Sequence, residues 1–344
     1  MNRYRQTGPL DDAPEVIGDT AFNALDLRTD GVLLPPGTAR ASENFRFTPE
    51  GAQVREGLAR QFAPGVFCPR ILHAGLYRPE SGPVRLAFVT YRSLVLVNPS
   101  DQTATEVPFP TGESVAKGDP VDFVQAGESD SSTRYAWILR GLDKDALKFD
   151  GDEIAVDANF KRGEFGLYAG GRIAVNDTSQ SLAVSDFLAY GAGNWSLLDI
   201  FKIMKGGDDY LLGMLAYQQY LVIASRQRFH LGYFDPDLVV DDMGDSFLRH
   251  MTQEGGCVGR RAMILAGGKF WFVSDHGIYV FQPQLDLQLV LLGEPISAPL
   301  EPVMARLNDT AAAGACIGRY RHRLYFALPI NGEAIRLSSL TITA

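Results

Sequence analysis

LAGGKFWFVS, at Leu265–Ser274, decides the fold of this chain because its pattern of residues recurs along the sequence. Three further copies are plain: YAGGRIAV at Tyr168–Val175, LAYQQYLVIAS at Leu215–Ser225 and IGRYRHRLYFAL at Ile317–Leu328. In each copy, apolar residues stand on both sides of a short turn. Where the turn is Gly-Gly, it supplies the positive φ that a two-residue turn needs, so the pattern predicts a β-hairpin.

Two looser copies, at Val84–Val97 and Arg134–Leu139, complete the series. The first apolar residue after the turn gives one anchor per copy: Leu86, Tyr135, Ile173, Tyr220, Phe270 and Leu324. Successive anchors are about 38 to about 54 residues apart, and a period near 50 is typical of propeller blades. The sequence therefore predicts an all-β fold, a β-propeller of about six four-stranded antiparallel blades.

The first two units divide into four short strands each, because their apolar segments are separated by turn residues. The strands predicted for the first unit are Ile71–Tyr77, Val84–Thr90, Ser93–Val97 and Thr103–Val107. Those predicted for the second unit are Val121–Gln125, Arg134–Leu139, Ala146–Phe149 and Glu153–Val156. Each unit thus has the content of one propeller blade.

We expect residues 1–30 to form an extended N-terminal arm, because this stretch is polar and its Pro and Gly residues break any periodicity. The arm is either a frayed terminus or a segment that orders against a neighbouring subunit. Residues 31–344 then form the propeller, and an N-terminal hairpin near 45–58 is a candidate to close the last blade.

Insertions between strands or blades are expected near 190–205, 234–256 and 295–312. The last of these contains Ser297–Leu307, whose apolar residues have helical spacing. Ser297 is the expected N-cap of this helix. Pro302 is expected in the first turn, where a helix tolerates proline.

Composition excludes several classes of protein. The formal net charge is −9 and the pI is near 5.1. The chain therefore lacks the basic face that a protein needs to bind nucleic acid through its phosphates. An acidic protein past which DNA slides remains compatible, since like charges prevent adhesion.

The N-terminus has no apolar signal-peptide core and no window reaches 18 apolar residues, so we expect a soluble protein. Cys68, Cys257 and Cys316 are far apart, which indicates a reduced, cytoplasmically made chain.

The sequence offers no catalytic, cofactor-binding or metal-binding motif. Its five histidines stand singly, and there is no nucleophile elbow, P-loop or dinucleotide fingerprint. The densest carboxylate cluster lies between Asp235 and Asp245 and does not match the spacing of an EF-hand loop. We interpret it as a solvated acidic loop.

Two basic clusters stand out, Arg260-Arg261 and the run from Arg319 to Arg323. On one strand, the alternate arginines of the run would share a face and could meet an acidic partner. A solvated turn is the interpretation we prefer for this run. Together with the arm and the acidic loop, these residues make up the predicted interface: Arg3, Tyr4, Arg5, Asp235, Asp237, Asp241, Asp242, Asp245, Arg319, Arg321 and Arg323.

Four segments carry a resemblance to a known family. They are Leu34–Ala39 with Asn44, Gly51 and Arg55-Glu56-Gly57; Leu182–Asp186 followed by Asn194-Trp195; Gly206–Asp209 leading into Leu211–Ile223; and Gly255–Phe281, with FVSDHGIY at Phe272–Tyr279. In this order they resemble the β-propeller tail proteins of short-tailed bacteriophages, called the tail hub or nozzle.

The resemblance implies a non-enzymatic virion protein without a cofactor, made in the host bacterial cytoplasm and located in the phage tail. Such proteins form a homo-oligomeric ring, expected to be a hexamer, below the portal and adaptor proteins and near tail fibre or needle proteins. Genomic DNA passes through the lumen without specific binding, and no membrane insertion is expected.

Two other functions remain open at this stage. One is a carbohydrate-binding or glycan-hydrolysing propeller, whose pocket would be lined by carboxylates and by Trp137, Trp195 and Trp271. The other is a cellular six-bladed interaction propeller. The presence of portal and terminase genes beside this one would exclude it.

Overall fold

The computed structural model describes residues 71–344 except 102, 117, 129–132, 197–208, 236–243, 253–254, 283–292, 321–322, 331–335 and 344. Four short strands before residue 55, and the strand at Arg336–Thr343, are described by their backbone alone. The chain divides into two compact units. The first comprises Met1–Ala59 and Ser297–Ala305, and the second comprises Arg60–Ile296 and Arg306–Ala344.

Two pairs of short strands occur in the first unit. Strand β1 (Ala24–Leu25) pairs in parallel with β2 (Thr38–Ala39). Strand β3 (Phe45–Thr48) pairs antiparallel with β4 (Gly51–Val54), with Thr48 opposite Gly51. The predicted N-terminal hairpin therefore forms, whereas its closure of the last blade stays a prediction. The predicted arm lies mostly outside the described residues.

The helical segment of this unit is shorter than the sequence predicted. A 3-10 turn, η2 (Ala298–Leu300), is followed by α1 (Glu301–Met304), with Pro302 in the first turn as expected. Ser297 is the N-cap residue of η2, but its side chain makes no capping hydrogen bond. Leu307, which was expected in the helix, instead forms a β-bridge with Ile330.

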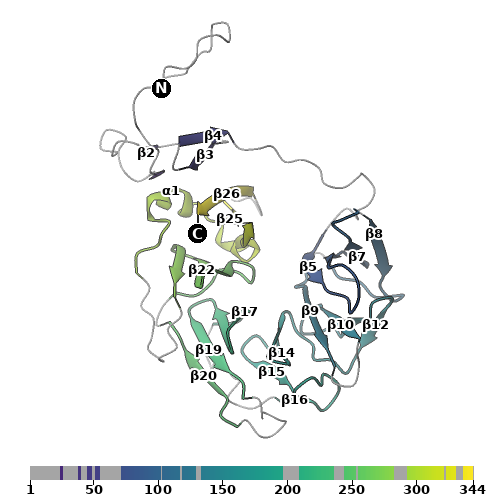
Figure 1. Ribbon diagram of the computed structural model, residues 1–344. Helices are drawn as coiled ribbons and strands as arrows, with labels where there is room; N and C mark the ends of the chain where they lie inside the picture. The colour runs from purple at the N-terminus through teal and green to yellow at the C-terminus, as the bar shows by residue number, and fades with distance from the viewer. Residues whose placement is uncertain are drawn as a thin grey trace. The chain divides into compact units, whose positions relative to one another are not determined.

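Six antiparallel sheets make up the second unit, and they follow one another in chain order (Figure 1). Blade one has β5 (His73–Tyr77), β6 (Arg85–Val89), β7 (Ser93–Val97) and β8 (Ala104–Pro108). Blade two has β9 (Asp122–Gly127), β10 (Arg134–Leu139), β11 (Ala146–Phe149) and β12 (Ile154–Asp157). Blade three has β13 (Gly166–Ala169), β14 (Arg172–Asn176), β15 (Leu182–Ser185) and β16 (Trp195–Ser196).

The remaining sheets complete this series. Blade four has β17 (Leu211–Tyr217), β18 (Tyr220–Ser225), β19 (Phe229–Tyr233) and β20 (Phe247–His250). Blade five has β21 (Met263–Ala266), β22 (Lys269–Ser274) and β23 (Gly277–Phe281). Blade six has β24 (Cys316–Tyr320), β25 (Arg323–Leu328) and β26 (Arg336–Thr343), after the 3-10 segment η3 (Asp309–Gly314). The last two blades thus have three strands each among the residues described, where four were predicted for blade five and a closing N-terminal hairpin for blade six.

The hairpin repeat is confirmed blade by blade. All six anchor residues lie in the second strand of their sheets, namely β6, β10, β14, β18, β22 and β25. The Gly-Gly turns have the positive φ that was expected, 58° and 81° at Gly170 and Gly171 and 61° and 73° at Gly267 and Gly268. The copy at Val84–Val97 is β6 with β7, so it is a hairpin of the second and third strands.

The first strands of successive blades contact one another in the order β5, β9, β13, β17, β21 and β24. Antiparallel sheets that follow one another in the chain and pack through their first strands form a β-propeller. The fold is therefore an all-β propeller, as the sequence predicted. Within the described parts of the chain, no helix is long and apolar enough to cross a membrane.

The hydrophobic core lies between consecutive blades. Between blades one and two, Leu94 and Leu96 pack with Ile138 and Phe149, and all four are almost fully buried. Between blades two and three, the ring of Trp137 stacks on Phe160 at 4.7 Å, and its Nε1 donates to Asp157 Oδ2 at 3.0 Å. Truncating such a buried aromatic side chain typically costs about 3–5 kcal/mol, so these contacts hold neighbouring blades together.

Candidate functional site

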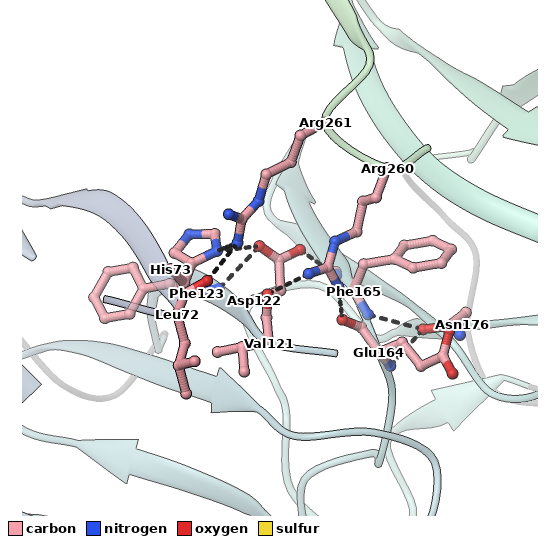
Figure 2. A network of polar contacts seen from close by, with 11 residues as sticks. Leu72, His73, Val121, Asp122, Phe123, Glu164, Phe165, Asn176, Arg260 and Arg261 are labelled. Atoms are coloured by element: carbon pink, nitrogen blue, oxygen red, sulfur yellow. Dashed lines mark hydrogen bonds and ion pairs between the residues drawn. The ribbon is translucent and has the colours of Figure 1, made fainter. Parts of the chain in front are cut away.

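A network of polar contacts lies where the first strands of blades one to three begin (Figure 2). We call it the arginine clamp and define it as His73, Asp122, Glu164, Arg260 and Arg261. His73 and Asp122 open β5 and β9, and Glu164 stands just before β13. Arg260 and Arg261 belong to the segment that leads into β21. The cluster therefore joins residues of four blades.

The segment before β21 is fixed closely by its own backbone. The Cys257 N–H donates to Ser225 O and the Val258 N–H donates to Val273 O, both at 2.9 Å. A Cβ at Gly256 would lie 2.3 Å from Ser225 O, and one at Gly259 would lie 2.6 Å from Ala313 O. Only glycine fits at these two positions. The two arginines are therefore presented from a rigid segment.

Cys257 adds a further contact within this segment. Its side chain is fully buried, and its Sγ lies 3.1 Å from Gly259 O as a donor. Burial raises the pKa of the Cys257 thiol to about 12. A thiol in this state stays protonated and unreactive at neutral pH, so Cys257 has a structural role.

Arg260 binds the main chain of blades two and three. Its Nη1 donates to Glu164 O and its Nη2 donates to Val121 O. Gly213 lies beneath the side chain, since a Cβ there would be 3.2 Å from Arg260 Cγ. Burial raises the pKa of the Glu164 carboxyl, and the charge of Arg260 opposes this shift. One guanidinium thus links two neighbouring blades.

Arg261 makes the same kind of contact with blade one. Its Nη2 lies 3.2 Å from Leu72 O and 2.7 Å from His73 Nδ1 (Figure 2). Its own carbonyl accepts the N–H of Ile317 at 2.8 Å, next to a β-bridge with Cys316. Burial and the neighbouring Arg260 lower the pKa of Arg261. Blade six is thereby connected through Arg261 to blade one.

His73 is neutral in this environment. Burial lowers its pKa to about 4; Asp122 opposes the shift, and the two arginines add to it. The distance of 3.6 Å between His73 Nδ1 and Asp122 Oδ1 would count as an ion pair only for a protonated imidazole. We favour the neutral form because Nδ1 accepts a hydrogen bond from Arg261, which is always protonated. The proton of His73 then resides on Nε2.

Asp122 and Asn176 order the strand starts around the arginines. Asp122 Oδ1 accepts the N–H of Phe123 at 3.0 Å, and its Oδ2 accepts the N–H of Gly166 at 3.2 Å. The buried Asn176 Oδ1 accepts the N–H groups of Glu164 and Phe165 at 2.8 and 3.0 Å. These bonds hold the two acceptor carbonyls of Arg260 in place.

The chemistry of the clamp is that of a crosslink between blades. Its guanidinium donors reach main-chain carbonyls, and His73 Nδ1 is occupied by a cation. A hydrogen bond to a charged group contributes about 1.5–3 kcal/mol, so several such bonds stiffen the contact between blades considerably. Among the residues that the structure describes, no three His, Cys, Asp or Glu residues come together as a metal site.

The predicted acidic interface is described only at its ends. Asp237, Asp241 and Asp242 lie outside the described residues. Asp235 Oδ2 accepts the N–H of Asp245 at 2.9 Å, and the N–H of Asp235 donates to Ser246 Oγ at 2.8 Å. The structure therefore brings Asp235 and Asp245 together as the base of a loop. Their role in an interface stays a prediction.

The basic run at the end of the chain is not on one strand. Arg319 lies in β24 and Arg323 opens β25, and Arg321 lies in the undescribed turn between them. Arg319 pairs with Leu324, the neighbour of Arg323, so Arg319 and Arg323 point to opposite faces of the sheet. The shared face that one strand would give is therefore wrong, because the chain reverses after Tyr320. Arg3, Tyr4 and Arg5 also lie outside the described residues.

The tryptophans proposed for a carbohydrate pocket are used in packing. Trp137 is fully buried, and Trp271 is 8% exposed with its Nε1 bound to Ala266 O at 3.2 Å. Trp195 donates to Tyr190 O at 3.2 Å and packs edge-on against Phe160. Trp137 and Trp271 are therefore not available to line a pocket for the alternative function.

The sequence analysis did not predict the arginine clamp. It noted the two adjacent arginines but none of their partners. Arg260-Arg261 was noted only as a basic cluster, whereas Arg261 binds Leu72 O and His73 Nδ1. A usable signal existed: when the repeats are aligned on their first strands, His73 and Asp122 open equivalent strands.

Comparisons with known proteins give only distant likenesses. No family model and no curated protein matches the chain. A solved extracellular domain from B. thetaiotaomicron is 11% identical with a TM-score of 0.45 over 80% of this chain, which spans 33% of that one. BBS1N in complex with ARL6DN is 12% identical with a TM-score of 0.46, covering 80% of this chain and 79% of that one. BamB from Moraxella catarrhalis is 8% identical with a TM-score of 0.37, covering 79% and 74%.

Proposed function

We propose that this chain is a non-enzymatic structural protein of a short-tailed bacteriophage tail, a hub or nozzle subunit. In this role it forms a homo-oligomeric ring, expected to be a hexamer, below the portal and adaptor. The ring surrounds the channel through which DNA leaves and docks other tail components. The virion tail is then its location, after synthesis in the host cytoplasm.

The arginine clamp is the observation that best supports a scaffold. Enzyme sites hold charged groups ready for a substrate, whereas the donors of Arg260 and Arg261 already bind carbonyls of Val121, Glu164 and Leu72. A propeller whose blades are crosslinked in this way keeps its shape when neighbours press on it. That property suits a ring that must stay open while DNA passes.

The segments that resemble the tail family also have architectural roles here. Ser185 Oγ accepts the N–H of Ile173 at 2.8 Å, and the N–H of Asp186 donates to Asn194 O at 2.8 Å. In the later segment, Ser274 pairs with Gly277 at the turn between β22 and β23, and Phe272 stacks on Tyr279 at 5.5 Å. The shared residues thus build hairpins. The acidic character of the chain agrees with DNA passage, because like charges prevent adhesion.

The purified protein tests this proposal by mass photometry and electron microscopy. We expect closed rings with a mass six times the 37.7 kDa of the subunit, alone or with portal and adaptor proteins present. A protein that stays monomeric in the presence of those partners would contradict the proposed ring. The same preparation is screened on a glycan array with a turnover assay, and release of reducing sugar would favour the carbohydrate-active alternative.

A further inference from the structure

A cavity lies at the other end of the strands that the clamp joins. Its volume is about 420 Å³, and it opens where β5, β9 and β13 end. Four lining residues follow one another at the end of β9, and the others come from blades one to three. The lining residues are Arg78, Gln125, Ala126, Gly127, Glu128, Arg134, Tyr168 and Leu188.

The wall of the cavity is fixed by hydrogen bonds between blades. Gln125 Oε1 accepts the N–H of Arg78 at 2.9 Å, and Gln125 Nε2 donates to Arg78 O at 2.7 Å. Within blade three, the N–H of Leu188 donates to Gly171 O at 2.8 Å, and Leu188 has a φ of 50°. A non-glycine residue keeps positive φ only where its surroundings hold it, so this wall is preorganised.

The charges in the cavity are unbalanced. Glu128 Oε1 is 3.3 Å from Lys148 Nζ, which also lies 3.6 Å over the ring of Tyr135. The side chains of Arg78 and Arg134 are exposed, and neither forms an ion pair within the part of the chain that the structure describes. The chain has 41 acidic against 32 basic residues, so carboxylates are not scarce. Two guanidinium groups therefore face one cavity without a bound carboxylate.

We propose that this cavity binds an acidic peptide segment, residues 10–19 of a second copy of this chain. The segment reads LDDAPEVIGD and has four carboxylates, at Asp11, Asp12, Glu15 and Asp19, and no basic residue. Clusters of arginine recognise acidic motifs because the planar guanidinium forms paired hydrogen bonds with a carboxylate. The inference rests on the proposed function, since it needs a neighbouring subunit.

A segment of the chain fits this cavity better than a free small anion does. The cavity is open and is bordered by Tyr168, whose side chain is 38% exposed, and by Leu188. An extended peptide can place apolar residues against these two and carboxylates against the arginines. A ring also supplies one segment for each cavity at high effective concentration, which compensates for weak contacts in each pair.

The test uses a labelled peptide of residues 8–21 and the full chain carrying D11N/D12N/E15Q/D19N, which removes competition by its own segment. Fluorescence anisotropy is expected to give saturable binding that weakens as salt is raised. The double variant R78E/R134E in this background should weaken binding by a factor of about 10 or more, since about 1.4 kcal/mol is tenfold. Arg92→Glu, an exposed arginine far from the cavity lining, is the matched control and should leave affinity unchanged.

Several outcomes would overturn the inference. The first is that R78E/R134E binds the peptide as tightly as the parent chain does, with an unchanged circular dichroism spectrum. The second is that a peptide with Asn and Gln in place of its acids binds as tightly as the acidic peptide. The third is that glucuronate or citrate binds where the peptide does not. The proposed function fails separately. Rings that form while the peptide does not bind would overturn this inference alone. Peptide binding by a chain that never forms rings would overturn the tail ring alone.

Discussion

At their starts, the first strands of blades one to three meet Arg260 and Arg261, whose donors reach three main-chain carbonyls and a neutral histidine. At their ends, the same three strands meet Arg78 and Arg134, whose exposed guanidinium groups line a cavity of about 420 Å³ without an ion pair within the described residues. The residue type is the same, and the surroundings differ. The guanidinium groups of the clamp have protein acceptors, whereas those at the cavity are open to water.

The difference assigns opposite roles to the two ends. A guanidinium with protein acceptors contributes to stability, and removing it leaves these acceptors without their donor. An exposed guanidinium contributes little to stability, so its position is free to serve binding. The clamp is therefore the structural end of these strands, and the cavity is the end open to a partner.

The largest effect is expected for Arg260→Ala. This substitution removes both hydrogen bonds to Val121 O and Glu164 O, at about 1.5–3 kcal/mol each for a charged donor. We expect the free energy of unfolding to fall by about 3–5 kcal/mol, measured by urea denaturation. Arg92→Ala, at an exposed arginine, is the control and should change it by less than about 0.5 kcal/mol. A loss below 1 kcal/mol for Arg260→Ala would show that the clamp does not hold the blades.

The hairpins could be predicted from the sequence because the information is local. Each is defined by apolar residues around a turn, and glycines with positive φ close it, as Gly170-Gly171 and Gly267-Gly268 do. The strands of blade two were predicted to within two residues at each end for the same reason. The turn within the basic run was harder to place, because the alternation of arginine with other residues from Arg319 to Arg323 suits a strand as well as the tip of a hairpin.

The clamp could not be predicted because it joins residues far apart in the chain. Arg260 lies 96 residues from Glu164 and 139 from Val121, and Arg261 lies 189 from Leu72. A pair of adjacent arginines gives no sign of which distant carbonyls it will meet. The tryptophans were misjudged for a related reason, since Trp137 stacks on Phe160, which lies in the connection from blade two to blade three. Composition indicates an aromatic ring but not whether packing covers it.

A smaller effect should separate the two ends by their dependence on pH. The folded pKa of His73 is lowered to about 4, so the unfolded state binds more protons between pH 6.5 and 4. Its contribution to stability is therefore complete above about pH 6.5 and is lost as the pH falls. The loss reaches about 2 kcal/mol at pH 5. His73→Gln should reduce the difference in unfolding free energy between pH 7 and pH 5.

Two comparisons make this measurement specific to the clamp. His230 is also buried with a pKa lowered to about 3, so a second part of the pH dependence should remain in His73→Gln. His276→Gln, at an exposed turn position outside the clamp, is the matched control and should leave the contribution of His73 in place. An identical pH profile for His73→Gln and the unmodified chain would contradict a neutral, clamp-bound imidazole.

The smallest effect on stability is expected at the cavity. Arg78→Ala and Arg134→Ala remove exposed side chains that make no ion pair within the described residues, so each should change the unfolding free energy by less than about 0.5 kcal/mol. Only the side chain of Arg78 is lost, since its backbone bonds to Gln125 remain. Urea denaturation of both variants beside Arg260→Ala measures this directly. A loss above 2 kcal/mol at either position would mean that its guanidinium also holds blades together, and the distinction between a structural and an open end would no longer stand.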